Sequence, residues 1–188
     1  MLERVLTVLI AFVTPLPWWF ILVHSIMRSS RLPLGRLAYL SIAPAWAITA
    51  YLAFTYQRLL FAHPFASGAV GFCIGLPILA AAAVIDLSVF RVLGFRRLVG
   101  LSEAGGERIP GVLVTRGIYQ YARHPIYVAH ALWSCGFGLL LGSPFLLFFA
   151  VYIFASFWLA TYFEEAELIQ RFGQDYREYR KRVPRFFV

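Results

Sequence analysis

Residues 113–127 gather side chains that can bind or orient a small charged molecule. Arginines, tyrosines and a histidine occur there at short spacing: Arg116, Tyr119, Tyr121, Arg123, His124 and Tyr127. Because Pro125 has no N–H to lose, Arg123-His124-Pro125 predicts the start of a helix whose free backbone N–H groups remain available. A helix start ringed by arginine suits a charged ligand. The alternative interpretation is an ordinary membrane-surface loop with arginines and tyrosines.

A second polar group follows at Glu164 and Glu165, at the end of a long apolar segment. This segment and the one that begins at Pro125 are joined by the short turn Gly142-Ser143-Pro144, so we expect an antiparallel hairpin that brings the polar ends together. The carboxylates suit an ammonium group, the arginines and helix N–H groups suit a carboxylate, and the tyrosine rings suit a cation or an aromatic base. The combination predicts a pocket for a zwitterion.

The composition is that of a membrane protein. Of 188 residues, 61% are hydrophobic and 14% are charged, whereas soluble domains are nearer ~45–50% apolar and ~25% charged. The formal net charge of +8 comes from arginines that flank apolar runs and do not form a stripe on a soluble module. We therefore assign the basic excess to membrane topology, with membrane lipids as neighbours, and expect no nucleic-acid partner.

The apolar segments predict an all-α, polytopic membrane protein with about five transmembrane helices. The expected spans are residues 5–27, 37–61, 69–90, 126–141 and 145–163. Pro15 and Pro17 are expected to bend the first span, and the long loop 91–125 precedes the fourth. After Phe163, apolar residues at three- and four-residue steps predict a C-terminal amphipathic helix with a break near Gly173.

We expect residues 1–188 to form one integral membrane domain. Residues 1–93 would hold the first three spans, where an acceptor would be selected, and residues 94–188 the cofactor-binding loop, the hairpin and the C-terminal helix. Of the 17 Lys and Arg residues, Arg4 and Arg58 fall on the side of the N-terminus, and the other 15 fall on the side of the long loop and the C-terminal tail. The positive-inside rule then predicts an external N-terminus and a cytoplasmic loop and C-terminus.

Three further features have two interpretations each. Asp86 is a functional candidate, because a carboxylate inside a span is costly, although an ion pair with Arg91 or another loop arginine is the somewhat commoner explanation. His130 more often packs or hydrogen-bonds between helices than binds a metal, and no metal site is expected. Gly136 and Gly138 permit either close helix packing or room for a flat ligand.

From residue 113 onward, four motifs follow in order: Leu113-Val114-Thr115-x-Gly117-x-Tyr119, Arg123-His124-Pro125-x-Tyr127, Glu164-Glu165, and Phe172-Gly173-x-x-Tyr176-x-x-Tyr179-x-x-x-Val183-Pro184. Together they resemble the isoprenylcysteine carboxyl methyltransferase family and its phospholipid N-methyltransferase relatives. The resemblance implies that the C-terminal half binds S-adenosylmethionine at the cytosolic membrane face without a Rossmann domain. It also implies that lipophilic acceptors arrive sideways from the bilayer. Ala129 and His130 depart from the family, which often has glycine two residues after the motif tyrosine.

The resemblance also implies roles for individual residues. It implies that Tyr119, His124, Pro125 and Tyr127 line the cofactor pocket, and that Glu164 and Glu165 serve the cofactor or the acceptor, with Arg171 on the acceptor side. From the residues themselves we also expect Gly138 at the cofactor, where it leaves room for a flat ligand, and Glu165 and Arg123 at the catalytic side. The first three spans match no motif of the family, so the resemblance does not reach the region where acceptor specificity would lie.

We therefore expect an S-adenosylmethionine-dependent methyltransferase of the membrane, with a bacterial inner membrane expected from the compact length. Its acceptor would be lipophilic: an isoprenylcysteine-like carboxylate, a lipid amine or a small thiol. One alternative is an NADPH-dependent membrane reductase of the sterol reductase type. Tryptophan-containing signatures would be expected in the tail of such an enzyme, and the tail here has no tryptophan. Another is a non-catalytic membrane scaffold. What counts against a scaffold is that it would have no function for the costly group of charged residues at one interface, namely Glu164, Glu165, Arg123 and His124.

Overall fold

The computed structural model describes residues 2–29, 42–61, 65, 68–98 and 112–187, and the statements below concern these residues. The described chain is built of α-helices and one short 3-10 helix. In chain order they are α1 (Leu2–Val13), α2 (Leu16–Ser29), α4 (Ala43–Thr55), α5 (Gln57–Leu60), α6 (Gly68–Leu98), η1 (Gly117–Gln120), α8 (Pro125–Leu141), α9 (Pro144–Phe172) and α10 (Gln174–Arg182). The predicted all-α class is confirmed.

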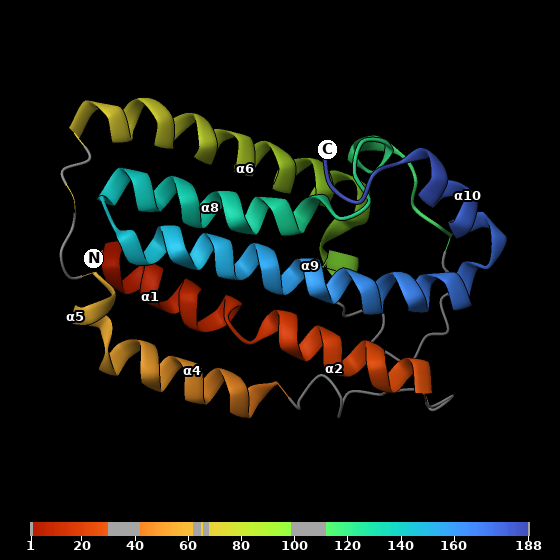
Figure 1. Ribbon diagram of the computed structural model, residues 1–188, viewed down its shortest axis with the longest axis horizontal. Helices are drawn as coiled ribbons and strands as arrows, with labels where there is room; N and C mark the ends of the chain where they lie inside the picture. The colour runs from red at the N-terminus through yellow and green to blue at the C-terminus, as the bar shows by residue number, and fades with distance from the viewer. Residues whose placement is uncertain (1, 30–41, 62–64, 66–67, 99–111, 188) are drawn as a thin grey trace.

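The long helices lie side by side in the order α6, α8, α9, α1 with α2, and α4 (Figure 1). The closest packing joins α6 to α8, where Gly75 and Gly136 let the two backbones approach. A Cβ atom on Gly136 would lie 2.6 Å from Leu79 Cδ2, so a larger residue would push the helices apart. Small residues at such contacts are typical of membrane helices. The interpretation of Gly136 as a packing residue is therefore supported.

Three helical segments of the described chain are long and apolar enough to cross a membrane: Glu3–Leu22, Gly68–Gly94 and Pro144–Phe172. They correspond to the first, third and fifth predicted spans. The fourth, α8, has 17 residues, at the lower limit of the roughly 17–25 that cross a bilayer. The second contains the 13-residue α4, and its expected first residues, 37–41, lie outside the described ranges. The chain is a polytopic all-α membrane protein.

The first span is broken at Pro15, as its prolines predicted, into α1 and α2. A broken helix leaves carbonyl groups without an intrahelical partner, which is costly in lipid unless neighbouring helices supply donors. Side chains of α4 and α9 do so here: Thr49 Oγ1 donates to Ala11 O at 2.8 Å, Trp46 Nε1 to Phe12 O at 3.0 Å, and the Tyr152 hydroxyl to Thr14 O at 3.4 Å. The break is thus fixed by packing on both sides.

One helix runs further than expected, and another joins two segments that were both predicted to be helical. The predicted loop 91–125 begins with helix, because α6 continues to Leu98 across a kink at Gly94, whose φ is 70°. The helix α9 continues past Phe163 without interruption to Phe172, and the predicted break follows at Gly173. At 1.5 Å per residue, the 29 residues of α9 measure ~43 Å, which exceeds the ~30 Å hydrocarbon core. The polar last turns of α9 therefore project beyond the membrane core.

A tight turn between α8 and α9 sets the geometry of the site. Gly142 has a φ of 62°, and its carbonyl accepts the N–H of Phe65 at 2.8 Å. Ser143 caps α9 by accepting the N–H of Leu146 at 3.4 Å. Because the turn is short, α8 and α9 are antiparallel, and α8 begins beside the second half of α9 (Figure 1), where His124 contacts Glu165.

Candidate functional site

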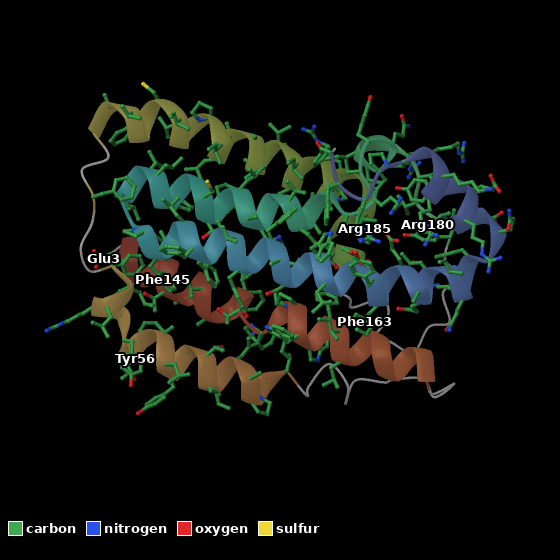
Figure 2. The ribbon with its side chains drawn as sticks, viewed as in Figure 1. Glu3, Tyr56, Phe145, Phe163, Arg180 and Arg185 are labelled. Atoms are coloured by element: carbon green, nitrogen blue, oxygen red, sulfur yellow. The ribbon has the colours of Figure 1, made fainter. Side chains whose placement is uncertain are left out.

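The polar residues singled out in the sequence meet at the end of the array opposite the Gly142 turn. The first turn of α8, the last turns of α9, η1, α10 and the tail after α10 all lie there (Figure 1). Figure 2 shows Arg180 and Arg185 at this end, far from Glu3 and Phe145. Along α9, Glu164 lies 20 residues after Pro144, or ~30 Å, about one hydrocarbon thickness away. The site is therefore placed at a membrane surface.

Glu165, on α9, is 2% exposed and lies among four basic side chains. Its Oε1 atom accepts from Arg123 Nη2 at 2.7 Å and from Arg123 Nε at 3.1 Å. Arg185 approaches side-on, with Nε 3.2 Å from Oε1 and Nη2 3.2 Å from Oε2. His124 Nε2 lies 3.2 Å from Oε1, and Arg180 Nη1 lies 3.9 Å from Oε2. Glu165 thus ties the start of α8 to α10 and the tail.

Glu164, the neighbouring carboxylate, is more open. Its side chain is 26% exposed, against 3% for that of Glu165. The Tyr127 hydroxyl donates to Glu164 Oε2 at 2.8 Å, and His124 Nδ1 lies 3.3 Å from the same oxygen. Glu164 is therefore more accessible to a cationic group than Glu165, which is enclosed by the groups it binds.

His124 lies between the two carboxylates and is buried. Burial alone would lower the pKa of His124, but the charges and hydrogen bonds of Glu164 and Glu165 outweigh it, so this pKa is raised above 6.5. The imidazole stacks on Tyr127, whose ring stacks in turn on Phe157, with centroids 5.6 Å and 4.3 Å apart. A flat wall of aromatic rings thus runs from the polar cluster into the apolar core between α8 and α9.

The tail after α10 folds back onto the start of α8. The Arg123 N–H donates to Pro184 O at 3.0 Å and the His124 N–H to Arg185 O at 3.0 Å. The Arg123 guanidinium also donates through Nη1 to Val183 O at 2.6 Å. The helix start is where the sequence predicted it, but the N–H groups of Arg123 and His124 are not available to a ligand, because the tail carbonyls accept them.

Tyrosines of α10 pack beneath this cluster. The Tyr179 hydroxyl donates to Tyr119 O at 2.6 Å, which joins α10 to η1. Tyr176 is 1% exposed, and its hydroxyl has no hydrogen-bond partner within the described part of the chain. Burial raises the pKa of Tyr176, and the nearby charge of Glu165 raises it further. A buried hydroxyl without a partner, close to a charged cluster, is the kind of group that a bound ligand or water satisfies.

Not every residue proposed from the sequence reaches the cluster. Arg123, His124, Pro125, Tyr127, Glu164 and Glu165 are brought together, and Tyr119 joins them through its backbone carbonyl. Gly138 lies 13 residues beyond Pro125, ~20 Å along α8. A Cβ on Gly138 would be 2.7 Å from Leu147 Cδ2, so this glycine packs against α9. Arg171 is exposed, with its guanidinium 5.2 Å from the centroid of the Phe172 ring.

Arg185 and Arg180 belong to the cluster but were not singled out from the sequence. The guanidinium of Arg185 also lies 4.2 Å from the centroid of the Tyr162 ring. Burial lowers the pKa of Arg185, but its bonds to Glu165 and Tyr162 outweigh this, and the pKa is raised. The available signal was Pro184, which ends α10 and precedes Arg185, but a proline does not say where the following chain returns.

Asp86 and His130 have ordinary partners. Trp133 Nε1 donates to Asp86 Oδ2 at 2.7 Å, so the partner found for Asp86 within the described ranges is Trp133 and not the expected Arg91. The other oxygen, Oδ1, is buried without a partner there. His130 donates through Nδ1 to Ile126 O at 2.7 Å and packs edge-on against Phe157. These contacts support the interpretation of His130 as a packing and hydrogen-bonding residue.

The chain is similar to known methyltransferases. The phospholipid methyltransferase family matches residues 70–175, more than half of the chain. Protein-S-isoprenylcysteine O-methyltransferase of Schizosaccharomyces pombe is 43% identical over 74 residues, which cover 39% of this chain and 31% of that protein. The proteins of this name from Homo sapiens and, as form B, Arabidopsis thaliana are each 42% identical over 73 residues, covering 38% of this chain and 26% and 37% of their own lengths.

The aligned part thus spans well under half of these curated relatives. No solved structure matches the chain. The family match runs from α6 through α8 and α9 into α10, and therefore includes both carboxylates and the basic residues at the start of α8. The chain belongs to the phospholipid methyltransferase family.

Proposed function

We propose that the protein is a membrane methyltransferase that takes its methyl group from S-adenosylmethionine and transfers it to a lipophilic carboxylic acid. Family membership supports the reaction class. The relatives are named as O-methyltransferases of protein S-isoprenylcysteine. The observation that carries the proposal is the pairing of a partly exposed carboxylate, Glu164, with the basic cluster around Glu165. A zwitterionic amino-acid group needs both charges in one place.

The residues present fit such a donor. S-adenosylmethionine supplies an electrophilic methyl group on a sulfonium sulfur. In our proposal Glu164 binds the ammonium group, because its carboxylate carries a negative charge and its side chain is 26% exposed. The rings of His124, Tyr127 and Phe157 offer faces for a cation or an aromatic base. The Tyr176 hydroxyl, buried and without a partner in the described chain, has a hydrogen bond to offer a ligand.

We propose a positioning role for Glu165, in place of the catalytic role expected from the sequence. Its two oxygens already bind Arg123 and Arg185 and contact His124, so it holds these groups in place. A carboxylate acceptor has no proton to lose before it attacks, whereas a neutral amine needs a proton acceptor. An enclosed, ion-paired Glu165 suits an acid acceptor better than an amine. The protein then contributes alignment and exclusion of water.

The acceptor would reach the site from the bilayer. The aromatic wall extends from His124 into the apolar region between α8 and α9, so a lipid chain could lie in the membrane while its polar end meets the cluster. We propose that residues 1–93 supply acceptor contacts and residues 94–188 the donor site. The positive-inside rule favours a cytoplasmic site, with the C-terminus inside and the N-terminus outside.

The proposal is tested by methyl transfer from tritiated S-adenosylmethionine to N-acetyl-S-farnesylcysteine, a lipophilic acid, with detergent-purified protein. We expect label in a base-labile methyl ester from wild type, and a large loss in Glu164→Gln. The matched control is Glu178→Gln, an exposed carboxylate on α10 that bonds Gln174 and Lys181. NADPH oxidation is measured in parallel with a sterol acceptor. NADPH turnover without methyl transfer would replace our proposal with the reductase alternative.

A further inference from the structure

Four basic side chains surround two carboxylates at the site: Arg123, His124, Arg180 and Arg185 face Glu164 and Glu165. The two carboxylates balance two of the four positive charges that the three arginines and a protonated His124 carry. When His124 carries its proton, the cluster therefore retains a net positive charge. Such a surplus at a partly buried position favours the binding of an anion.

Arg185 is the member of this cluster that is both fixed and accessible. The Arg123 side chain is 8% exposed, and its nitrogens already serve Glu165 and the carbonyls of Arg180 and Val183. Arg180 is 49% exposed and 3.9 Å from Glu165, so solvent screens it. Arg185 is 23% exposed and faces Glu165 with Nε and Nη2. The edge of its guanidinium that carries Nη1 is therefore not used by Glu165.

The guanidinium of Arg185 is held in position by its surroundings. The Tyr162 ring lies against one face at 4.2 Å, the Tyr162 side chain also hydrogen-bonds the guanidinium, and Glu165 holds the side edge. The backbone of Arg185 is fixed separately, because its carbonyl accepts the His124 N–H at 3.0 Å. The adjacent Phe186 packs against the rings of His124 and Phe154. A donor group that is fixed before its ligand arrives loses little conformational freedom on binding.

We propose that Arg185 binds the carboxylate of a ligand through the guanidinium edge that Glu165 leaves unused. Arginine suits this task, because its planar fork matches the two oxygens of a carboxylate. The inference rests on the proposed function, in which two carboxylates come to the site: that of the methyl donor and that of the acceptor. Both share this chemistry, and the experiment below separates them.

The binding experiment compares S-adenosylhomocysteine with 5′-methylthioadenosine, which lacks the amino-acid part, by calorimetric titration of the full chain. Arg185→Ala, Arg185→Lys and the control Arg177→Ala, an exposed arginine of α10, are compared with wild type. If Arg185 binds the donor carboxylate, Arg185→Ala weakens the binding of S-adenosylhomocysteine by about tenfold or more and leaves the affinity for methylthioadenosine unchanged. Arg185→Lys recovers part of the loss, because the charge returns without the fork.

A kinetic arm identifies the acceptor carboxylate. If Arg185 binds it, both nucleosides keep their affinities, and KM for N-acetyl-S-farnesylcysteine rises about tenfold while inhibition by the corresponding carboxamide is unchanged. Equal weakening of both nucleosides would show a merely structural arginine and overturn the assignment. So would unchanged affinities together with an unchanged KM. Wild type that binds neither nucleoside and transfers no methyl group would refute the proposed function and this assignment together.

Discussion

Exchanging one carboxylate at a time separates the roles of Glu164 and Glu165. Glu165→Gln keeps the shape of the side chain but removes the charge that Arg123 and Arg185 share at 2.7–3.2 Å. Breaking a buried ion pair by removing one partner costs roughly 3–5 kcal/mol. The amide oxygen still accepts one bond, so we expect the lower end, about 3 kcal/mol. Glu164→Gln, at a side chain 26% exposed, should cost about 1 kcal/mol.

The loss of stability should be measurable at the backbone hydrogen bonds that hold the tail after α10. The amide N–H groups of Arg123 and His124 are bonded to the tail carbonyls of Pro184 and Arg185, and they exchange with solvent when the tail opens. A loss of about 3 kcal/mol corresponds to roughly a hundredfold faster exchange, and about 1 kcal/mol to roughly fivefold. Hydrogen exchange followed by mass spectrometry in detergent measures both. Equal exchange in the two variants, or wild-type exchange in Glu165→Gln, would refute the tethering role of Glu165.

Three further predictions concern proton binding, the broken first span and the hairpin turn. Because the pKa of His124 is raised, its protonated form stabilises the fold fully below pH 6.5, and this stability is lost as pH rises through the raised value. The thermal unfolding midpoint of wild type should fall as pH rises through this range, and that of His124→Gln should fall less. An equal pH dependence of the two midpoints would contradict the ion-paired imidazolium. Thr49→Val should lose about 1–3 kcal/mol by leaving the Ala11 carbonyl unpaired, whereas Thr49→Ser should not; equal unfolding midpoints would contradict this explanation. Gly142→Ala should prevent correct folding, because its Cβ would lie 2.0 Å from Phe65 O, whereas Gly68→Ala, also at positive φ but in open space, should cost about 1–2 kcal/mol. Similar expression and unfolding midpoints for both would contradict the turn geometry.

The meeting of the two polar motifs was predictable because a short turn leaves little freedom. Gly142-Ser143-Pro144 forces α8 and α9 to be antiparallel, so His124 must lie near the last turns of α9. The break at Pro15 was predictable for a similarly local reason. Which side chains would satisfy the freed carbonyls was not, because Thr49 reaches Ala11 only through the packing of α4 against α1.

The tail shows where local patterns stop being informative. The role of Arg185 depends on the chain turning back after Pro184 and pairing with Arg123 and His124, some sixty residues earlier. Hydrophobic periodicity does not report such a contact. The break at Gly173 was predicted, but the continuity of the helix across Phe163 was not, because Glu164 and Glu165 end the apolar run while backbone hydrogen bonding continues to Phe172. The spacing of Gly136 and Gly138 left close packing and room for a ligand both open, and the contact of Gly138 with Leu147 supports the packing interpretation.

The cluster around Glu164 and Glu165 is, in our proposal, a methyl-donor site. Calorimetric titration of detergent-purified protein with S-adenosylhomocysteine tests it most directly, in wild type, Glu164→Gln and Glu178→Gln. We predict saturable binding by wild type, about 10–100-fold weaker binding by Glu164→Gln through loss of a charge-assisted hydrogen bond, and no change in Glu178→Gln. Absence of binding to folded wild type, or equal binding by all three proteins, would contradict the claim.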